Sequence, residues 1–313
     1  RNRGATPHRP RCEDQMPRLL TGSLQAPRMY RGLPVPGWFH ESTSTALQAM
    51  ELRPTDVVLA SWPKSGTHWV YRALRLLTMV GPPPEPSMVL AEMLKAGPAD
   101  HFCGGPGSPD DSFTALLDRE AALGSARLIV SHATPVLLPS FEAAGKLVYV
   151  ARDPRDVVTS NYFFMGTPKD GWDGSMRRFC APADETPNAF GGWFEHVRAF
   201  EAVVASLGPE RACVIEYEQM HGDLRGTLAR LAALLGPEAE ARLRRDGDAI
   251  EAALGFGAMK ADAGAGHDRF LRKGVAGGWR EHFSESDEAA LMAAVGERLP
   301  IEPSSAVGVG SWR

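Results

Sequence analysis

The stretch that decides the fold is residues 57–69, which read VVLASWPKSGTHW. Its first part is an apolar, β-branched run typical of a buried strand, and the apolar residues after it recur at helical spacing as far as Val80. The sequence therefore predicts a strand, a tight loop and a helix in succession. The loop carries a cation, small residues and a hydroxyl, namely Lys64, Ser65, Gly66 and Thr67. Because the N–H groups and positive dipole of a helix N-terminus follow directly, we interpret this loop as a phosphate cradle.

This loop differs from a Walker A loop. In G-x-x-x-x-G-K-[ST] the Lys directly follows the second Gly, whereas Lys64 lies two residues before Gly66. Short turns that contain Gly are common, so these residues alone also allow an ordinary strand-to-helix turn with a solvated Lys64.

Two further apolar runs end in polar residues. Residues 127–131 (RLIVS) predict a buried parallel strand that leads into His132, and residues 146–150 (KLVYV) predict another that leads to Arg152. Ligands of open α/β sheets bind outside the carboxyl ends of the strands. His132 and Arg152 are therefore candidate site residues, although a lone His is more often structural.

A helix is expected to follow the second run. Asp153 suits the N-cap and Pro154 the first helical position, so Ser160 lies two turns inside the helix. Because residues seven apart share a face, Ser160 is expected above the capped end, with Arg152 opposite it. Short strand, helix and loop segments then follow, and residues 214–218 (VIEYE) predict one such strand and 224–235 a capped amphipathic helix.

A glycine-interrupted basic stretch lies near the end of the chain, at residues 270–280 (FLRKGVAGGWR). Its N–H groups and the cations Arg272 and Lys273 could surround an anion. The alternative is a solvated run of charge.

Together these blocks resemble the signatures of the cytosolic-type sulfotransferases. Residues 61–69 resemble P-K-S-G-T-x-W, residues 149–160 resemble Y-V-A-R-N-x-K-D-V-x-x-S, and residues 272–280 resemble R-K-G-x-x-G-D-W-K. Residues 256–260 match F-x-x-M-K. The blocks stand in the order of the family, from about Tyr30 to Phe283.

The resemblance implies a donor, 3′-phosphoadenosine 5′-phosphosulfate (PAPS), and a role for each block. His132 would be the general base, and Lys64 would stabilise the leaving phosphate oxygen, without a metal. The residues that would bind the donor are Lys64, Ser65, Gly66, Thr67, His68, Trp69, Arg152, Ser160, Tyr217, Phe256, Met259, Arg272, Lys273 and Gly274. The acceptor would be a small molecule with a hydroxyl or amine, bound by loops at Trp38, 101–107 and 163–172, and its identity is not encoded in one sequence.

The chain departs from the family patterns at several positions. Val130 and Ser131 replace the Lys and Thr of K-T-H-x-P, which removes one cation near the reacting group. A homodimer is allowed, but the family dimer motif K-x-x-x-T-V-x-x-x-E is degraded, since its positions read Arg280, Ser284, Glu285 and Ala289.

Composition excludes some partners. The 313 residues include 34 basic and 38 acidic side chains, a net charge of −4, so we expect neither a nucleic acid nor a membrane surface as partner. The four Cys residues lie far apart without a C-x-x-C pair, which favours free thiols in a reducing, cytoplasmic location and no disulfide or zinc site. No apolar run approaches the ~18 residues of a membrane span.

We expect a disordered N-terminal tail over residues 1–28 and one domain over residues 29–313. The predicted fold is a three-layer α/β domain, with a central parallel sheet flanked by helices, that resembles P-loop kinases. Two alternatives to a sulfotransferase remain, a protein that binds PAPS without turnover and a nucleotide kinase.

Overall fold

The structure is a computed structural model, and it describes residues 28–35, 41, 45, 48–79, 126–164, 170–181, 190–263 and 272–299. The predicted tail lies outside the described residues except for Arg28, which begins strand β1. The predicted acceptor-pocket residues Trp38 and 101–107 also lie outside them, as do 165–169.

A parallel four-stranded sheet forms the centre of the described part, in the order β4-β3-β5-β6. Its strands are β3 (Val57–Ser61), β4 (Leu128–Ser131), β5 (Lys146–Ala151) and β6 (Ala212–Glu216). Val57 pairs with Leu128 on one side and with Lys146 on the other. Residues 57–60 are fully buried, as expected for a parallel strand covered on both faces. A separate antiparallel pair joins β1 (Arg28–Tyr30) to β2 (Leu33–Val35).

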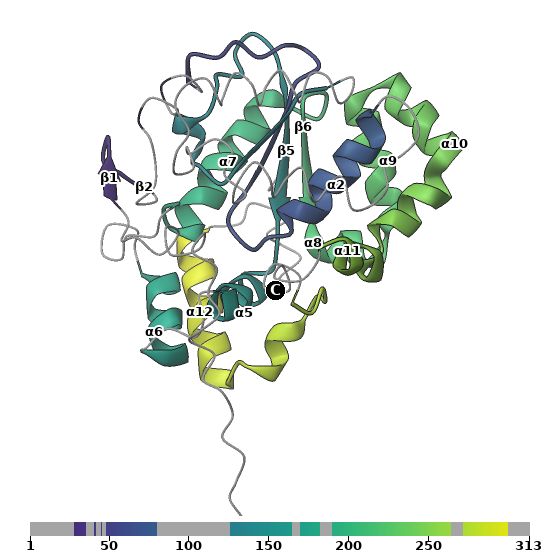
Figure 1. Cartoon of the computed structure of the whole chain (residues 1–313). Coiled ribbons are helices and arrows are strands. Elements are labelled where there is room, and N and C mark those ends of the chain that lie inside the picture. The colour runs from purple at the N-terminus through teal and green to yellow at the C-terminus, as the bar shows by residue number, and fades with distance from the viewer. Residues whose placement is uncertain are drawn as a thin grey trace, which may run out of the picture.

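Helices cover both faces of the sheet (Figure 1). Val57 and Leu59 belong to a core cluster with the helices of one face, which are α2 (Thr67–Thr78), α9 (Leu224–Leu235) and α10 (Pro237–Leu254). Val58 and Ala60 belong to the cluster of the other face, whose helices are α5 (Pro154–Phe164), α6 (Gly171–Cys180), α7 (Trp193–Leu207) and α12 (Glu285–Arg298). This alternation follows from the two-residue period of a strand. The prediction of a three-layer α/β domain is confirmed.

Short sequence patterns predicted several helices correctly. The predicted helix over residues 224–235 is α9, and the side chain of Asp223 caps it by accepting from the N–H of Gly226. Asp153 likewise caps α5, because its Oδ1 accepts from the N–H of Arg155 at 2.9 Å. Both caps satisfy N–H groups that have no partner within the helix.

One predicted strand was wrong at its end. Residues 214–218 were expected to be extended, but β6 stops at Glu216 and helix α8 (Tyr217–Gly222) begins with Tyr217. The last pair of the β5–β6 ladder joins Ala151 to Glu216, and β5 ends there. Without a neighbouring strand to bond to, the backbone of Tyr217 turns into a helix, where its N–H and C=O groups find partners.

The order of the strands places a topological switch point at their carboxyl ends. The connection after β3 leads to β4 on one side of the sheet, whereas the connection after β5 leads to β6 on the other side. Ligands of open α/β sheets bind where two neighbouring connections diverge in this way. In Figure 1, helices α5, α8 and α11 (Phe256–Ala263) lie around the lower ends of the strands. The short 3-10 turns are η2 (Pro135–Leu137) and η3 (Gly278–Glu281). Within the described ranges, no helix is both long and apolar enough to span a membrane.

Candidate active site

The loop between β3 and α2 has an unusual backbone. Both Lys64 (φ 71°) and Gly66 (φ 106°) are left-handed, and for a residue with a side chain this conformation costs roughly 1–2 kcal/mol. Such strain concentrates at functional sites. Gly66 is the N-cap of α2 and has no side chain to satisfy the first N–H groups of the helix. A Cβ at Gly66 would lie 2.5 Å from Cδ2 of Tyr217, so only Gly fits there. This geometry suits an anion at the start of α2.

His132 lies beside this loop, because β4 pairs with β3. Its Nδ1 is 2.8 Å from the carbonyl oxygen of Ser61 and 3.3 Å from the Ser61 hydroxyl. A carbonyl only accepts, so Nδ1 carries the proton and Nε2 carries the lone pair. The Ser61 hydroxyl also lies 2.6 Å from the hydroxyl of Thr67 at the start of α2. The ring of Phe190 meets the His132 ring edge to face, at 5.4 Å. His132 is thus a buried histidine with a fixed tautomer at the edge of the loop between β3 and α2.

Arg152 joins the separate blocks of the sequence. Its guanidinium donates to the carbonyl oxygens of Lys64, at 3.0 Å, and Val275, at 3.2 Å. It also lies 4.1 Å from the centroid of the Tyr217 ring and 3.7 Å from a carboxylate oxygen of Asp156. Its Nε is buried, and no acceptor reaches that atom within the part of the chain that the structure describes. A buried donor without an acceptor is costly and rare, which indicates a place for an anion.

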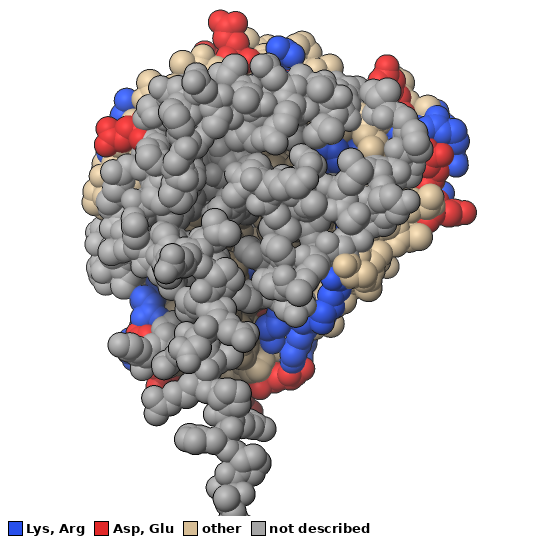
Figure 2. Space-filling model, viewed as in Figure 1, with Lys and Arg blue, Asp and Glu red and all other residues tan. Residues whose placement is uncertain are grey.

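The carboxylate of Asp156 holds the basic stretch near the end of the chain, which we call the basic loop (residues 272–280), against α5. Asp156 accepts from the N–H groups of Gly277, at 2.6 Å, and Trp279, at 2.9 Å. Burial and then repulsion by Arg152 lower the pKa of Arg272, whose guanidinium lies 4.4 Å from the centroid of the Phe163 ring. On the face in Figure 2, Lys and Arg side chains gather below α11, in the region of this loop. The fold thus brings the guanidinium groups of Arg152 and Arg272 close to each other.

Lys273 is exposed and forms an ion pair with Glu281. Its contact with a phosphate, which the resemblance implies, stays a prediction. Lys64 has its ammonium group 4.1 Å from the centroid of the Phe164 ring. Ser160 lies two turns into α5 and is half-buried, as predicted from its spacing to Arg152.

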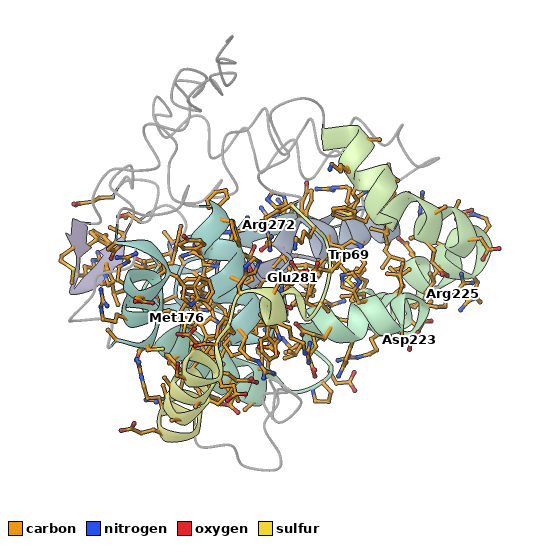
Figure 3. The ribbon with its side chains drawn as sticks, turned by 90° about the horizontal axis from the view of Figure 1, so that it is seen from below. Trp69, Met176, Asp223, Arg225, Arg272 and Glu281 are labelled. Carbon is orange, nitrogen blue, oxygen red and sulfur yellow. The ribbon has the colours of Figure 1, made fainter. Side chains whose placement is uncertain are left out.

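Aromatic rings gather around Trp69 on α2. The ring of Trp69 lies 5.6 Å from that of Tyr217 and 4.8 Å from that of His221, measured between centroids. The indole N–H of Trp69 donates to the carbonyl of Leu254 at 3.0 Å. In Figure 3, Trp69 and Arg272 lie in the middle of the view, between the helices of the two faces. Sequence reasoning missed His221 because it extended a strand through residue 218. Only a helix, here α8, brings residues four apart such as Tyr217 and His221 onto one face.

Phe256 and Gly274 also meet here. A Cβ at Gly274 would lie 2.1 Å from the Phe256 ring, so the basic loop packs directly on α11. Met259 on the same helix is buried, at 4% exposure. Of the other predicted donor residues, Ser65 and Thr67 are buried and His68 is half-buried. The structure therefore gathers the predicted donor residues at one edge of the sheet.

Val130 is not part of this group of residues. It is 1% exposed and packs in the core cluster beneath α2 and α10. The position where the family pattern has Lys therefore contributes to the core here.

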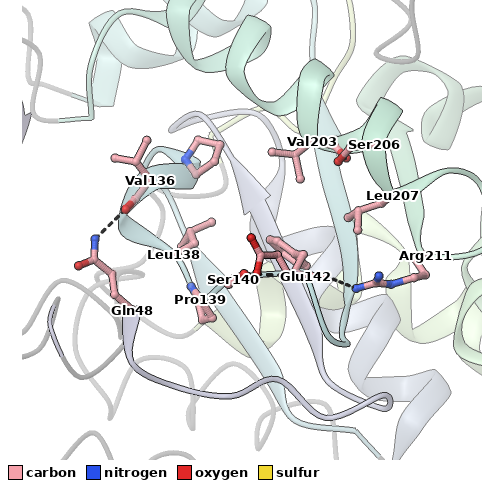
Figure 4. Close-up of a pocket in the computed structure, with 12 residues that line it drawn as sticks. Gln48, Val136, Leu138, Pro139, Ser140, Glu142, Val203, Ser206, Leu207 and Arg211 are labelled. Atoms are coloured by element: carbon pink, nitrogen blue, oxygen red, sulfur yellow. Dashed lines mark hydrogen bonds between the residues drawn. The ribbon is translucent and has the colours of Figure 1, made fainter.

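A shallow groove of about 550 Å³ lies away from these residues, between η2, the loop before β5 and the end of α7 (Figure 4). Gln48 bonds to the carbonyl of Val136 at one end, and Arg211 bonds to the loop before β5 at the other. None of the lining residues is a predicted site residue; they are Gln48, Pro135, Val136, Leu138, Pro139, Ser140, Phe141, Glu142, Val203, Ser206, Leu207 and Arg211. Across the described residues, no group of three or more His, Cys, Asp or Glu is placed to hold a metal ion, and metal-free chemistry stays a prediction.

Glu218 is a buried carboxyl at the edge of the site. One oxygen accepts from the N–H of Asp153 at 3.1 Å, and the other is buried without a partner among the described residues. Burial raises the pKa of Glu218 from 4.5 to about 7. The folded state therefore binds this proton more tightly than the unfolded state. The stability that the proton contributes is complete below pH 4.5 and is lost as the pH rises through about 7.

We expect Glu218→Gln to stabilise the protein more at about pH 8 than at about pH 5, because Gln never has to ionise in the buried site. Melting temperatures of parent and variant at both pH values measure this. Glu142→Gln, which changes an exposed carboxyl in the loop before β5, is the control. A Glu218→Gln effect that is the same at both pH values would contradict the assignment.

Comparison with known proteins agrees with this geometry. Residues 54–300 match the family model of the sulfotransferase domain. Mouse sulfotransferase 2B1 is 29% identical over 291 residues, which cover 86% of this chain and 79% of that protein.

Solved structures share the fold. The crystal structure of mouse sulfotransferase SULT7A1 complexed with PAP superposes with a TM-score of 0.65 at 21% identity, and covers 91% of this chain and 98% of that one. Retinol dehydratase in complex with androsterone and inactive cofactor PAP gives a TM-score of 0.59 at 22% identity, and covers 91% and 95%. The three-layer architecture of this chain is therefore that of the sulfotransferase fold.

Proposed function

Because this chain belongs to the sulfotransferase domain family and is thus an enzyme that transfers sulfate, we propose that its donor is PAPS and that His132 is its general base. The acceptor is a hydroxyl or amine of a small molecule. The observation that carries the proposal is the position of Arg152, which bonds to the carbonyls of Lys64 and Val275 and thereby joins the phosphate loop to the basic loop.

The charges around Arg152 suit a nucleotide that is phosphorylated at both ends. The N-terminus of α2 and Lys64 would hold the 5′-phosphosulfate. Arg272 and the orphaned Nε of Arg152 would hold the 3′-phosphate. The rings of Trp69 and Tyr217 would enclose the adenine, since aromatic faces stack well on a base. PAP in the two structural relatives is consistent with this donor.

The chemistry assigned to the chain follows from two side chains. When bound, PAPS would supply an activated sulfuryl group with a phosphate as its leaving group. Nε2 of His132 carries the lone pair and would take the proton of the acceptor, because Nδ1 is committed to the carbonyl of Ser61. Lys64 would place its ammonium group where negative charge develops on the leaving oxygen.

A nucleotide kinase is less well supported. It would be expected to present a carboxylate that holds a metal after a buried strand. Asp153 follows β5, but it caps α5 and forms an ion pair with Arg155 at 2.7 Å.

Product analysis tests the proposal. We expect the purified protein to add a sulfuryl group from PAPS to at least one member of a panel of phenols, alcohols, amines and steroids, detected by mass. Androsterone belongs in the panel because a relative with this fold was solved with it.

Lys64→Met is expected to lower kcat by a larger factor than it weakens binding of 3′-phosphoadenosine 5′-phosphate (PAP). The reason is that Lys64 stabilises mainly the transition state, in which the leaving oxygen gains charge.

Three outcomes would contradict these assignments. Binding of PAPS without product across the panel would leave a binding protein. Transfer of the γ-phosphate of ATP with magnesium would indicate a kinase. A Lys64→Met variant with weaker PAP binding and normal kcat would make Lys64 a binding residue only.

A further inference from the structure

A second histidine lies behind His132. His196 on α7 is fully buried, and its Nε2 is 3.2 Å from the main-chain carbonyl oxygen of His132. Its Nδ1 is 3.0 Å from the hydroxyl of Tyr149 on β5. A chain of two hydrogen bonds thus runs from the central sheet to the backbone of His132. Tyr149 lies in the predicted strand over residues 146–150, and His196 was not among the predicted site residues.

The direction of these bonds is fixed. The carbonyl of His132 only accepts, so Nε2 of His196 carries the proton, and Nδ1 accepts from the hydroxyl of Tyr149. Burial, followed by the proximity of His132, lowers the pKa of His196 to about 3. Burial also raises the pKa of Tyr149 far above its ordinary value. Both side chains therefore stay neutral near neutral pH, so Tyr149 remains the donor to His196, and His196 remains the donor to the carbonyl of His132.

The surroundings of this pair are apolar. The Phe200 ring stacks on Tyr149 at 4.7 Å and lies 4.8 Å from the His196 ring, between centroids. A hydrophobic residue pair of similar size would pack here without any polar group to satisfy, and a net hydrogen bond adds only about 0.5–1.5 kcal/mol. Packing alone does not require this pair. What the pair does contact is the main chain of the proposed base.

We propose that His196 is a positioning residue that holds the backbone of His132, with Tyr149 holding His196 in the required tautomer. This inference rests on the proposed function, in which His132 is the base. His132 is then held at two points, its carbonyl by His196 and its Nδ1–H by the carbonyl of Ser61. Because a displacement of about 1 Å at a reacting group can lower the rate about 10²-fold, loss of one anchor should reduce turnover.

Two variants of His196 separate positioning from packing. The amide of His196→Gln reaches the place of Nε2 and can still donate to the carbonyl of His132, whereas the shorter His196→Asn replaces only Nδ1. Both remove an aromatic ring from the same buried site. We expect His196→Asn to lose at least about tenfold in kcat with PAP affinity within about twofold of the parent. His196→Gln is expected to recover most of that loss.

Melting temperature, PAP affinity and kcat are measured on the same samples. The inference is overturned if folded His196→Asn turns over like the parent, or if both variants lose activity only in proportion to their folded fraction. If neither His196 variant folds, Tyr149→Phe is measured instead, because it keeps the ring and removes only the hydroxyl that bonds to His196. It should lower kcat several-fold with PAP affinity unchanged, and an unchanged kcat would again overturn the inference.

A His132→Ala control separates this inference from the function on which it rests. A large loss for His132→Ala with none for His196→Asn removes only the positioning role. Normal turnover by His132→Ala removes the base assignment and the positioning role with it, and product formation from PAPS in the parent still decides the sulfotransferase function.

Discussion

Replacement of His132 by alanine is expected to lower kcat about 10²–10⁴-fold, the usual contribution of a general base. PAP affinity should change little, because no phosphate contact is assigned to His132. The reason lies in the geometry: Nδ1 is committed to the carbonyl of Ser61 at 2.8 Å, so Nε2 is the ring nitrogen with the lone pair.

Melting temperature, PAP affinity and kcat, measured on one purified sample of His132→Ala, decide between catalysis and structure. A structural role predicts a destabilised protein whose activity falls only with the folded fraction. Ser61→Ala is the matched control, since it removes the hydroxyl near the His132 ring but keeps the carbonyl that holds Nδ1. It should lower kcat far less. Turnover of folded His132→Ala within tenfold of the parent would show that another group takes the proton.

The second large effect concerns the 3′-phosphate. PAP should bind at least about tenfold more tightly than AMP, because a hydrogen bond to a charged group contributes about 1.5–3 kcal/mol. Arg152→Ala is expected to weaken PAP binding about 10- to 100-fold and to remove most of this preference. The orphaned Nε of Arg152 and its bonds to Lys64 and Val275 place it at the centre of the site.

Calorimetry with PAP and AMP measures both affinities. Arg225→Ala is the control for net charge, because Arg225 pairs with Glu251 at the edge of the molecule, far from Arg272 in Figure 3. It should leave the preference for PAP unchanged. Equal affinities of the parent for PAP and AMP would overturn the roles of Arg152 and Arg272.

The sequence by itself determined the local elements of this protein. Apolar runs identified β3 and β5, the cap at Asp153 identified the start of α5, and an amphipathic pattern identified α9. These signals are reliable because the interactions that cause them lie within a few residues of one another. Motif spacing also identified the loop at Lys64 and Gly66, whose left-handed backbone the structure contains.

Only the tertiary structure decided which elements meet. Arg152 bonds to carbonyls 88 and 123 residues away, and β6 ends where its partner β5 ends. The same long-range packing joins His196 to the backbone of His132, 64 residues away. Hydrophobic periodicity reveals which face of an element is buried, but not which other element covers it. The contacts between distant segments follow from the order of the strands and the packing of the helices, which only the folded chain specifies.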